Sequence, residues 1–205
     1  MGDEAQVLIV CTGNICRSPF IERLLQHRLD ERLEGSGVRI VVHSAGTGAL
    51  VGSAMDPRAA AQLLAHGGEP AGFSARDVTP ELIAESDLVL TATREHRGRV
   101  ARLSPAAMRR VFTFRDFAHL VAGIDVSGDP TRSDSDPAEP TRQVRQIRQI
   151  RQVTAKAAAS RGLKPPLVPD LADIVDPYRR EDEVFATMAQ QITDAMPAVV
   201  RALVG

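Results

Sequence analysis

Short apolar runs alternate with amphipathic stretches along most of this chain, and this alternation restricts the fold more than any other feature of the sequence. The apolar runs at 7–10, 38–42, 87–93 and 110–114 are predicted strands. The first of them, Val-Leu-Ile-Val, contains no polar residue, so we expect it to be buried on both faces of a sheet. Alternation of this kind is typical of an α/β fold with a parallel sheet.

Helix starts are marked by capping residues and prolines. A helix is predicted over 19–33, because apolar side chains recur there at helical spacing and Ser18 before Pro19 resembles an N-cap followed by proline. Asp56 and Thr79 are the predicted caps of two shorter helices. These two helices and a C-terminal one are expected at 56–68, 79–86 and about 181–203.

The composition fits one globular domain, since the chain has 205 residues, 43% of them hydrophobic and 25% charged. The formal charge is −1 and aromatic residues make up 3%, so we expect no nucleic-acid partner. No apolar run has the length of a signal peptide core or a membrane span, so no membrane partner is expected. Because Cys11 and Cys16 are the only cysteines, we expect a cytoplasmic protein with reduced thiols.

Residues 118–172 depart from the alternation. Asp, Pro and Ser dominate residues 127–141, as in a mobile loop, and a three-residue repeat of Arg, Gln and an apolar residue follows at 142–153. The repeat predicts a helix with a slowly drifting apolar stripe and arginines beside it. The helix either lies solvated against the domain or serves as a basic docking helix for a partner protein, and the sequence leaves both interpretations open. The stripe consists of Val144, Ile147, Ile150 and Val153.

The loop between the first strand and the first helix, Cys-Thr-Gly-Asn-Ile-Cys-Arg-Ser at 11–18, is a predicted anion site. Its backbone amides and the unpaired N–H groups at the start of the helix can surround an oxyanion. Gly13 and Asn14 tolerate backbone conformations that other residues avoid, and Arg17 can donate two parallel hydrogen bonds to a phosphate. The loop lacks the Gly-Lys-Ser/Thr ending of a nucleoside triphosphate site.

Cys11 is the predicted nucleophile of this loop. Electropositive surroundings favour the thiolate form of a cysteine, so we expect Cys11 to be ionised at neutral pH and aimed at the centre of a bound phosphate. Ser18 can donate a hydrogen bond to that thiolate. Attack on phosphorus would give a phosphocysteine that water hydrolyses. The alternative is a small buried hydrophobic residue at the end of a strand, and the surrounding Gly, Asn, Arg and Ser-Pro favour the nucleophile.

A general acid is needed to protonate the leaving oxygen, and the chain offers four Asp-Pro pairs for this purpose. Asp56 is expected to cap a helix, while Asp129 and Asp136 lie in the loosest part of the chain, where an acid is poorly held. Asp176 lies between an apolar stretch and the final helix, and Pro177 restricts its loop. We therefore predict Asp176 as the acid.

Four segments resemble the low-molecular-weight protein tyrosine phosphatases, and they occupy residues 7–25, 44–48, 87–93 and 176–188. The resemblance implies a doubly wound three-layer α/β sandwich with a central four-stranded parallel sheet. It also implies hydrolysis of phosphotyrosine, in a protein or a small aryl phosphate, through a phosphocysteine and without a metal or cofactor. Residues 1–205 would then form a single phosphatase domain with an Arg-rich insertion at about 118–172.

The family pattern also implies a role for each matching residue. Cys11 would be the nucleophile, Arg17 the phosphate clamp, and Asp176 the general acid and then the base. Asn14 and Ser44 would together hold the loop in shape. Cys16 would be the second loop cysteine, which either pairs reversibly with Cys11 under oxidation or fills space in the loop. The implied phosphate-binding residues are Thr12, Gly13, Asn14, Ile15, Cys16, Arg17 and Ser18.

Three features depart from the family pattern. Leu50 stands where an aromatic residue or histidine usually lines the substrate groove. Phe73 stands where a histidine often supports Ser44. The third departure is the insertion itself. Because Tyr178 is the only aromatic residue expected beside the pocket, the predicted groove residues are Leu50 and Tyr178.

Two other functions are compatible with the same loop. An arsenate reductase on this scaffold would need an external small thiol, because the chain has no further cysteines to resolve the adduct. A catalytically idle anion-binding regulatory module, docking partners through 142–153, would gain nothing from a thiolate and an acid together. We therefore favour the phosphatase.

Overall fold

A four-stranded parallel sheet forms the centre of the computed structural model, which describes residues 4–124 and 141–205. The strands follow the spatial order β2-β1-β3-β4, so β1 lies between two neighbours that come later in the sequence. This confirms the predicted α/β fold with a four-stranded parallel sheet. The strands are β1 Ala5–Cys11, β2 Ile40–Gly46, β3 Leu88–Thr91 and β4 Val111–Thr113.

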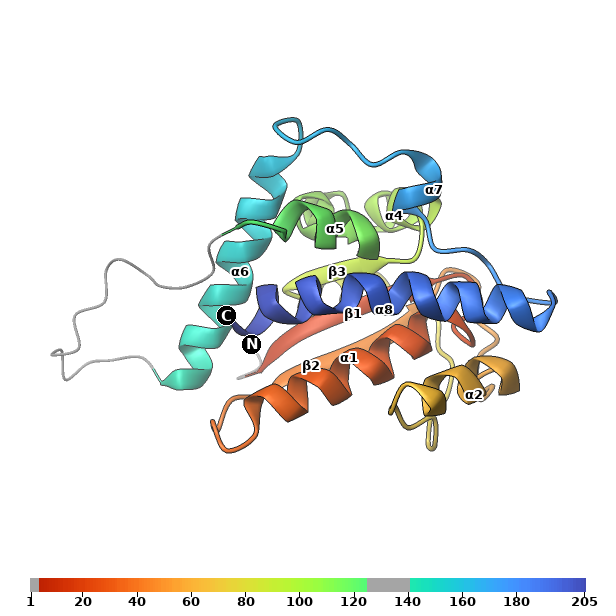
Figure 1. The fold of residues 1–205 in the computed structure, drawn as a ribbon. Coiled ribbons are helices and arrows are strands. Elements are labelled where there is room, and N and C mark those ends of the chain that lie inside the picture. The colour runs from red at the N-terminus through yellow and green to blue at the C-terminus, as the bar shows by residue number, and fades with distance from the viewer. Residues whose placement is uncertain (1–3, 125–140) are drawn as a thin grey trace, which may run out of the picture.

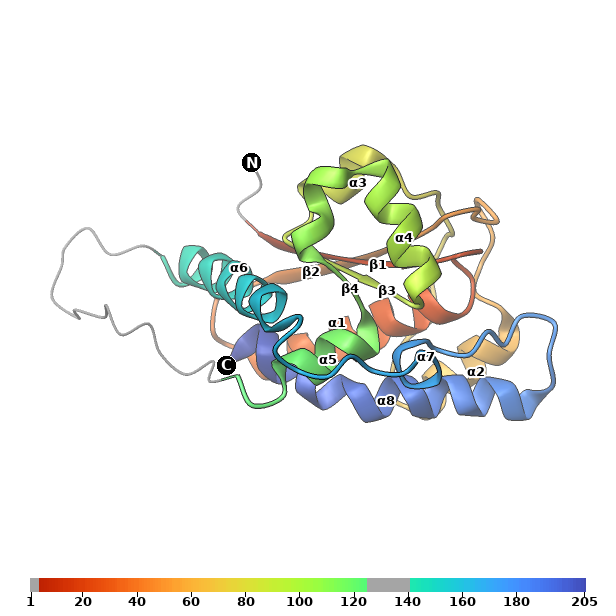
Figure 2. The same ribbon diagram turned by 90° about the horizontal axis from the view of Figure 1, so that it is seen from above.

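Helices cover both faces of the sheet, as Figure 2 shows, with α3 and α4 on one side and α1, α5 and α8 on the other. The doubly wound, three-layer arrangement expected from the family resemblance is therefore confirmed. On the first face lie α3 Pro80–Glu85, α4 Arg94–Leu103 and the 3₁₀ helix η1 Pro105–Arg110. On or beside the second lie α1 Arg17–Leu33, α2 Pro57–Ala65, α5 Phe114–Val121 and α8 Asp182–Val204. The remaining helices are α6 Arg142–Ser160 and α7 Pro169–Ala172.

The central strand β1 is buried on both faces, as its uniformly apolar sequence predicts. Val7 and Ile9 belong to the larger core, which α1, α5 and α8 cover, while Leu8 and Val10 belong to the smaller core on the α3 and α4 face. Burial on both sides fixes the end of this strand, and Cys11 is its last residue.

Two of the predicted helix caps are confirmed and one is wrong. Asp56 accepts a hydrogen bond from the Arg58 amide at 2.9 Å, and the Thr79 hydroxyl accepts one from the Leu82 amide at 3.3 Å. However, α1 begins at Arg17, so Ser18 lies inside the helix and is not its cap. Its hydroxyl points into the loop instead, where it contacts Cys11 and Asn14.

Helices α4 and α5 have no counterpart among the individually predicted helices. The segment that forms α4 is strongly charged, and only His96 and Val100 are buried in it. The first residues of the predicted insertion at 118–172 belong to α5, which completes a layer of the domain. Asp129 and Asp136 lie outside the described residues.

Helix α6 lies against the domain near the amino ends of the strands (Figure 1). Ile150 and Val153 are buried, whereas Val144 at the start of the stripe is 38% exposed. Arg151 pairs with Asp87, just before β3, at 2.7 Å. This placement agrees with the first interpretation of the repeat, a solvated helix lying against the domain.

The segment after α6 is fastened to the domain by two cations. The Arg161 guanidinium stacks on the Phe112 ring at 3.9 Å from its centroid. Lys164 Nζ donates hydrogen bonds to three backbone carbonyls at the end of α5, those of His119, Leu120 and Ala122. No helix in the described ranges, 4–124 and 141–205, is long and apolar enough to span a membrane.

Candidate active site

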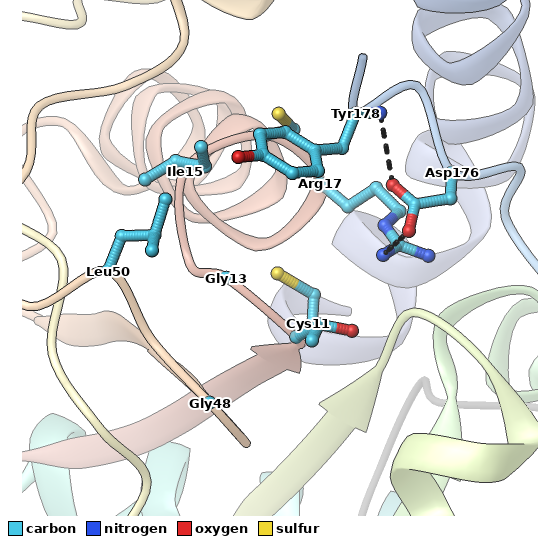
Figure 3. A pocket seen from close by; sticks show the side chains of 10 residues that line it. Cys11, Gly13, Ile15, Arg17, Gly48, Leu50, Asp176 and Tyr178 are labelled. Carbon is cyan, nitrogen blue, oxygen red and sulfur yellow. Dashed lines mark hydrogen bonds and ion pairs between the residues drawn. The ribbon is translucent and has the colours of Figure 1, made fainter. Parts of the chain in front are cut away.

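A pocket opens at the carboxyl end of β1, where the strand order reverses and ligands bind in open α/β sheets. Three segments meet there: the loop at 11–18, the loop after β2 and the loop before α8 (Figure 3). The structure thus brings together predicted residues from widely separated parts of the chain. The lining residues are Cys11, Thr12, Gly13, Ile15, Cys16, Arg17, Gly48, Leu50, Asp176 and Tyr178.

Cys11 is buried at the bottom of this pocket, and its sulfur lies 2.9 Å from the Ser18 hydroxyl oxygen. Asn14 Nδ2 donates a hydrogen bond to the same hydroxyl oxygen at 2.9 Å. Because the Ser18 oxygen already accepts from Asn14, its own proton is available to the sulfur. A hydroxyl that donates to sulfur stabilises the thiolate, the form that attacks phosphorus.

Asn14 directs this hydroxyl because its side chain is fixed at both ends. Its φ of 54° is left-handed, a conformation that asparagine tolerates better than most residues. Asn14 Oδ1 accepts from the Arg76 amide at 2.9 Å, so Nδ2 points the other way, toward Ser18 and Ser44. The side chain is fully buried, so this network is shielded from water.

Ser44 is the second hydroxyl that Asn14 holds, at 2.7 Å, and it donates its own proton to the Glu22 carboxylate. Burial raises the pKa of Glu22, while the Ser44 hydrogen bond opposes that shift. Arg76 Nε donates to the Ser44 carbonyl at 3.0 Å. The loop is therefore supported by Glu22 and Arg76, neither of which we predicted from the sequence.

Phe73, which stands where a histidine often supports Ser44, takes no part in this network among the described residues. Its ring lies 5.7 Å from the Arg23 guanidinium and packs at the edge of the larger core. One signal could have identified Glu22: it follows Ser18 by four residues on α1, so both side chains face the loop.

The backbone amides of the loop are available to an anion. Those of Gly13, Ile15 and Cys16 donate no hydrogen bond within the part of the chain that the structure describes. The helix α1 starts at Arg17 and directs its unpaired N–H groups to the same place. These are the amides from which the sequence predicts a nest for an anion, and anion binding by them stays a prediction.

Arg17 and Asp176 meet at this pocket as the sequence predicts. Arg17 Nη2 and Asp176 Oδ2 are 2.7 Å apart, and Asp176 Oδ1 accepts from the Tyr178 amide at 3.2 Å (Figure 3). Arg17 Nε is buried and has no acceptor among the described residues. The guanidinium thus retains a donor for an oxyanion, while the Asp176 side chain is 54% exposed at the pocket mouth.

Cys16 is a second buried, free thiol that lines the pocket together with Cys11. Burial, with smaller contributions from nearby carboxylates and Cys11, raises the pKa of Cys16 to about 12. Cys16 therefore remains a protonated thiol at physiological pH. Its pairing with Cys11 under oxidation stays a prediction.

Leu50 and Tyr178 lie at the pocket mouth, where they are 44% and 41% exposed. The Leu50 amide donates to the Gly13 carbonyl at 3.0 Å, which ties the loop after β2 to the phosphate loop. Gly46 is required at the base of that loop, because a Cβ there would lie 2.3 Å from the Thr12 carbonyl oxygen. The predicted groove residues thus occupy the predicted place.

The model of the family described as "Low molecular weight phosphotyrosine protein phosphatase" matches residues 6–157. The chain belongs to this family. The chain is therefore an enzyme, a low-molecular-weight protein tyrosine phosphatase.

Curated relatives of this phosphatase match over about half of the chain. The low molecular weight protein-tyrosine-phosphatase Wzb of Escherichia coli is 39% identical over 108 residues, which cover 53% of this chain and 68% of the relative. The low molecular weight protein-tyrosine phosphatase A of Mycobacterium tuberculosis is 43% identical over 110 residues, covering 53% of this chain and 65% of that protein.

Solved structures match the phosphatase over nearly its whole length. The Erwinia amylovora tyrosine phosphatase AmsI aligns with a TM-score of 0.65 and 24% identity, covering 98% of this chain and 95% of that one. The YwlE arginine phosphatase of Geobacillus stearothermophilus aligns with a TM-score of 0.63 and 23% identity, covering 96% and 91%. At these identities the likeness shows the fold alone.

Proposed function

We propose that this phosphatase hydrolyses phosphotyrosine, in a protein or a small aryl phosphate, through a phosphocysteine on Cys11 and without a metal or cofactor. One observation carries the proposal. The Ser18 hydroxyl directs its proton at the Cys11 sulfur, and Cys11 lines the same pocket as Arg17 and Asp176. The proposed nucleophile Cys11, the proposed anion clamp Arg17 and the proposed acid Asp176 thus line one pocket.

In the first step the phosphoryl oxygens accept hydrogen bonds from the loop amides and from the Arg17 guanidinium. The Cys11 thiolate attacks phosphorus, a sulfur–phosphorus bond forms, and the bond from phosphorus to the ester oxygen breaks. Asp176 donates its proton to the departing oxygen, so the alcohol leaves neutral. The exposed position of Asp176 at the mouth supports this role, because the ester oxygen points outward.

In the second step water attacks the phosphocysteine and the sulfur–phosphorus bond breaks. Asp176, now a carboxylate, accepts the proton of the water, and inorganic phosphate is released. The Ser18 hydroxyl stabilises the thiolate as it departs, since its proton is directed at the sulfur by Asn14. Each group returns to its initial protonation state.

The walls above the sulfur support an aryl substrate. Ile15, Leu50 and Tyr178 give the mouth apolar surfaces that a phenyl ring can contact. Among the described residues that line the pocket, only Tyr178 provides an aromatic face, so we expect ring recognition to depend on Tyr178 and on general apolar contact.

We also infer that residues 1–205 form one phosphatase domain with an insertion at about 118–172. Packing of Ile150 and Val153 of α6 into the same core as α5 and α8 supports this division. Because α6 lies near the amino ends of the strands and the pocket lies at a carboxyl end, a partner docked on 142–153 would sit away from the pocket.

The proposed activity is tested with a phosphotyrosine peptide, the same peptide with phosphoserine, and arsenate with glutathione. We expect the first to be hydrolysed far faster than the second, no arsenite release, and no effect of EDTA. Cys11→Ser should abolish hydrolysis while the circular dichroism spectrum stays unchanged. Hydrolysis by the Cys11→Ser variant would contradict the mechanism, and arsenite release would favour the reductase.

A further inference from the structure

His96 is a buried imidazole that the proposed mechanism does not use. It lies in the first turn of α4 with 5% of its surface exposed. Its Nδ1 lies 2.7 Å from the Thr93 hydroxyl oxygen, and its Nε2 lies 2.8 Å from the Thr12 hydroxyl oxygen. His96 therefore connects the start of α4 with the residue that follows the nucleophile.

The hydrogen-bond partners of His96 favour one tautomer of its ring. Burial lowers the pKa of His96 to about 4, and the Arg17 cation contributes to the same shift, so the ring is neutral near pH 7 and has one donor and one acceptor nitrogen. The Thr93 hydroxyl oxygen accepts from the His96 amide at 3.3 Å. Within the described part of the chain, His96 Nδ1 is the sole acceptor for the Thr93 hydroxyl proton. This pattern favours the tautomer in which Thr93 donates to Nδ1 and Nε2–H donates to Thr12.

This tautomer leaves the Thr12 hydroxyl proton unused. The Thr12 oxygen accepts from His96, and no protein acceptor for its proton lies among the residues that the structure describes. Thr12 is an exposed residue of the pocket lining, next to Cys11 in the chain. A hydroxyl with a fixed oxygen and a free proton is a donor directed at whatever occupies the pocket.

We propose that the Thr12 hydroxyl donates a hydrogen bond to an oxygen of the bound phosphate monoester, and that His96 is the positioning residue that orients it. The inference rests on the proposed function, since it takes the pocket as the phosphate site. Thr12 thereby adds a side-chain donor near the pocket mouth to the backbone donors at its floor. The same hydrogen bond forms with inorganic phosphate, which has an oxygen in every position of the ester.

The first test replaces the hydroxyl without changing the shape of the side chain. Thr12→Val should raise the inhibition constant for inorganic phosphate about tenfold and lower kcat/KM for p-nitrophenyl phosphate by about the same factor, the usual effect of one hydrogen bond to a charged group. Thr12→Ser keeps the hydroxyl and should recover most of this loss. Thr187→Val is the matched control, because that exposed hydroxyl on α8 donates to the Glu183 carbonyl one turn earlier and does not line the pocket.

The second test asks whether His96 acts through Thr12. His96→Leu should weaken phosphate binding in the wild-type background and should add nothing in the Thr12→Val background. A further loss in the double variant would show that His96 acts by another route and would overturn its assignment. Thr12→Val, which leaves the buried ring in place, remains informative even where His96→Leu folds poorly.

The two proposals fail in different ways. If the wild-type protein binds phosphate and turns over p-nitrophenyl phosphate but Thr12→Val matches it, only the Thr12 inference is overturned. If the wild-type protein does neither, the proposed function fails and the Thr12 inference fails with it.

Discussion

The floor and the mouth of the pocket face the same space but are held in different ways. The floor, which we define as Cys11, Asn14, Arg17, Ser18 and Ser44, is buried, and all of these residues except Arg17 form one hydrogen-bond network through Asn14. The mouth, which we define as Leu50, Asp176 and Tyr178, is 41–54% exposed. The mouth is held mainly through its backbone: the Leu50 amide donates to the Gly13 carbonyl, and the Tyr178 amide donates to the Asp176 carboxylate.

This difference assigns different tasks to the two regions. A buried network with its donors already directed costs little reorganisation when charge develops on phosphorus. Exposed side chains on loops adapt to the group that leaves and to the ring that carries it. Changes in the floor should therefore affect every substrate alike, whereas changes in the mouth should depend on the substrate.

Arg17→Lys should have the largest effect of the substitutions below. Lysine keeps the positive charge but cannot offer the forked donors of the guanidinium, so kcat/KM should fall on the order of 10³ for good and poor leaving groups alike. Steady-state rates with phenyl phosphate and p-nitrophenyl phosphate measure this. A loss confined to one of the two substrates would break the distinction between floor and mouth.

Asp176→Asn should come next and should behave as a mouth residue. Asparagine cannot protonate the leaving oxygen, so kcat for phenyl phosphate should fall about 10²-fold, the usual contribution of a general acid. The loss should be smaller for p-nitrophenyl phosphate, whose leaving group needs little protonation. An equal loss with both substrates would argue against Asp176 as the acid.

Asn14→Ala should lower activity about tenfold, because the Ser18 hydroxyl loses the donor that directs its proton. Stability should fall too, since Ser18 and Ser44 lose a buried partner and alanine is strained at a φ of 54°. Activity assays and urea denaturation measure the two effects. The same fractional loss is expected with phenyl and p-nitrophenyl phosphate, and unequal losses would contradict a floor role.

Leu50→Ala should have the smallest effect, about threefold on KM for aryl phosphates, because it removes part of one apolar wall. The inhibition constant for inorganic phosphate should not change, since phosphate has no ring to contact that wall. A matching rise in the phosphate inhibition constant would place Leu50 in the floor network instead.

Sequence reasoning identified the contiguous part of the floor more fully than the groups that support it. Cys11 and Arg17 could be predicted because strand, loop and helix follow one another in the chain, and local chemistry suffices to interpret them. Arg76 and His96 could not, since their roles depend on contacts that exist only after folding, and the only local signal for Glu22 was its spacing of four residues from Ser18. His96 was the hardest to foresee, because it lies on α4, whose charged sequence carries little apolar pattern.

The incorrect helix cap has a simple cause. Ser18 resembled a cap because it was judged by its neighbours in the sequence. In the folded protein the Ser18 hydroxyl lies between Asn14 and Cys11 instead. Asp176, which local grounds singled out as the acid, lies beside Arg17 from the other end of the chain, and its role as the acid stays a prediction.

Trapping the covalent intermediate tests the central claim most directly. In Asp176→Asn, p-nitrophenyl phosphate should still phosphorylate the enzyme, but the attacking water lacks its base, so the intermediate should accumulate. Acid quenching within the first turnover, followed by mass spectrometry of the peptides, should locate the phosphoryl group on Cys11. Turnover without a phosphoryl group on Cys11, or with one on Cys16 instead, would contradict this account.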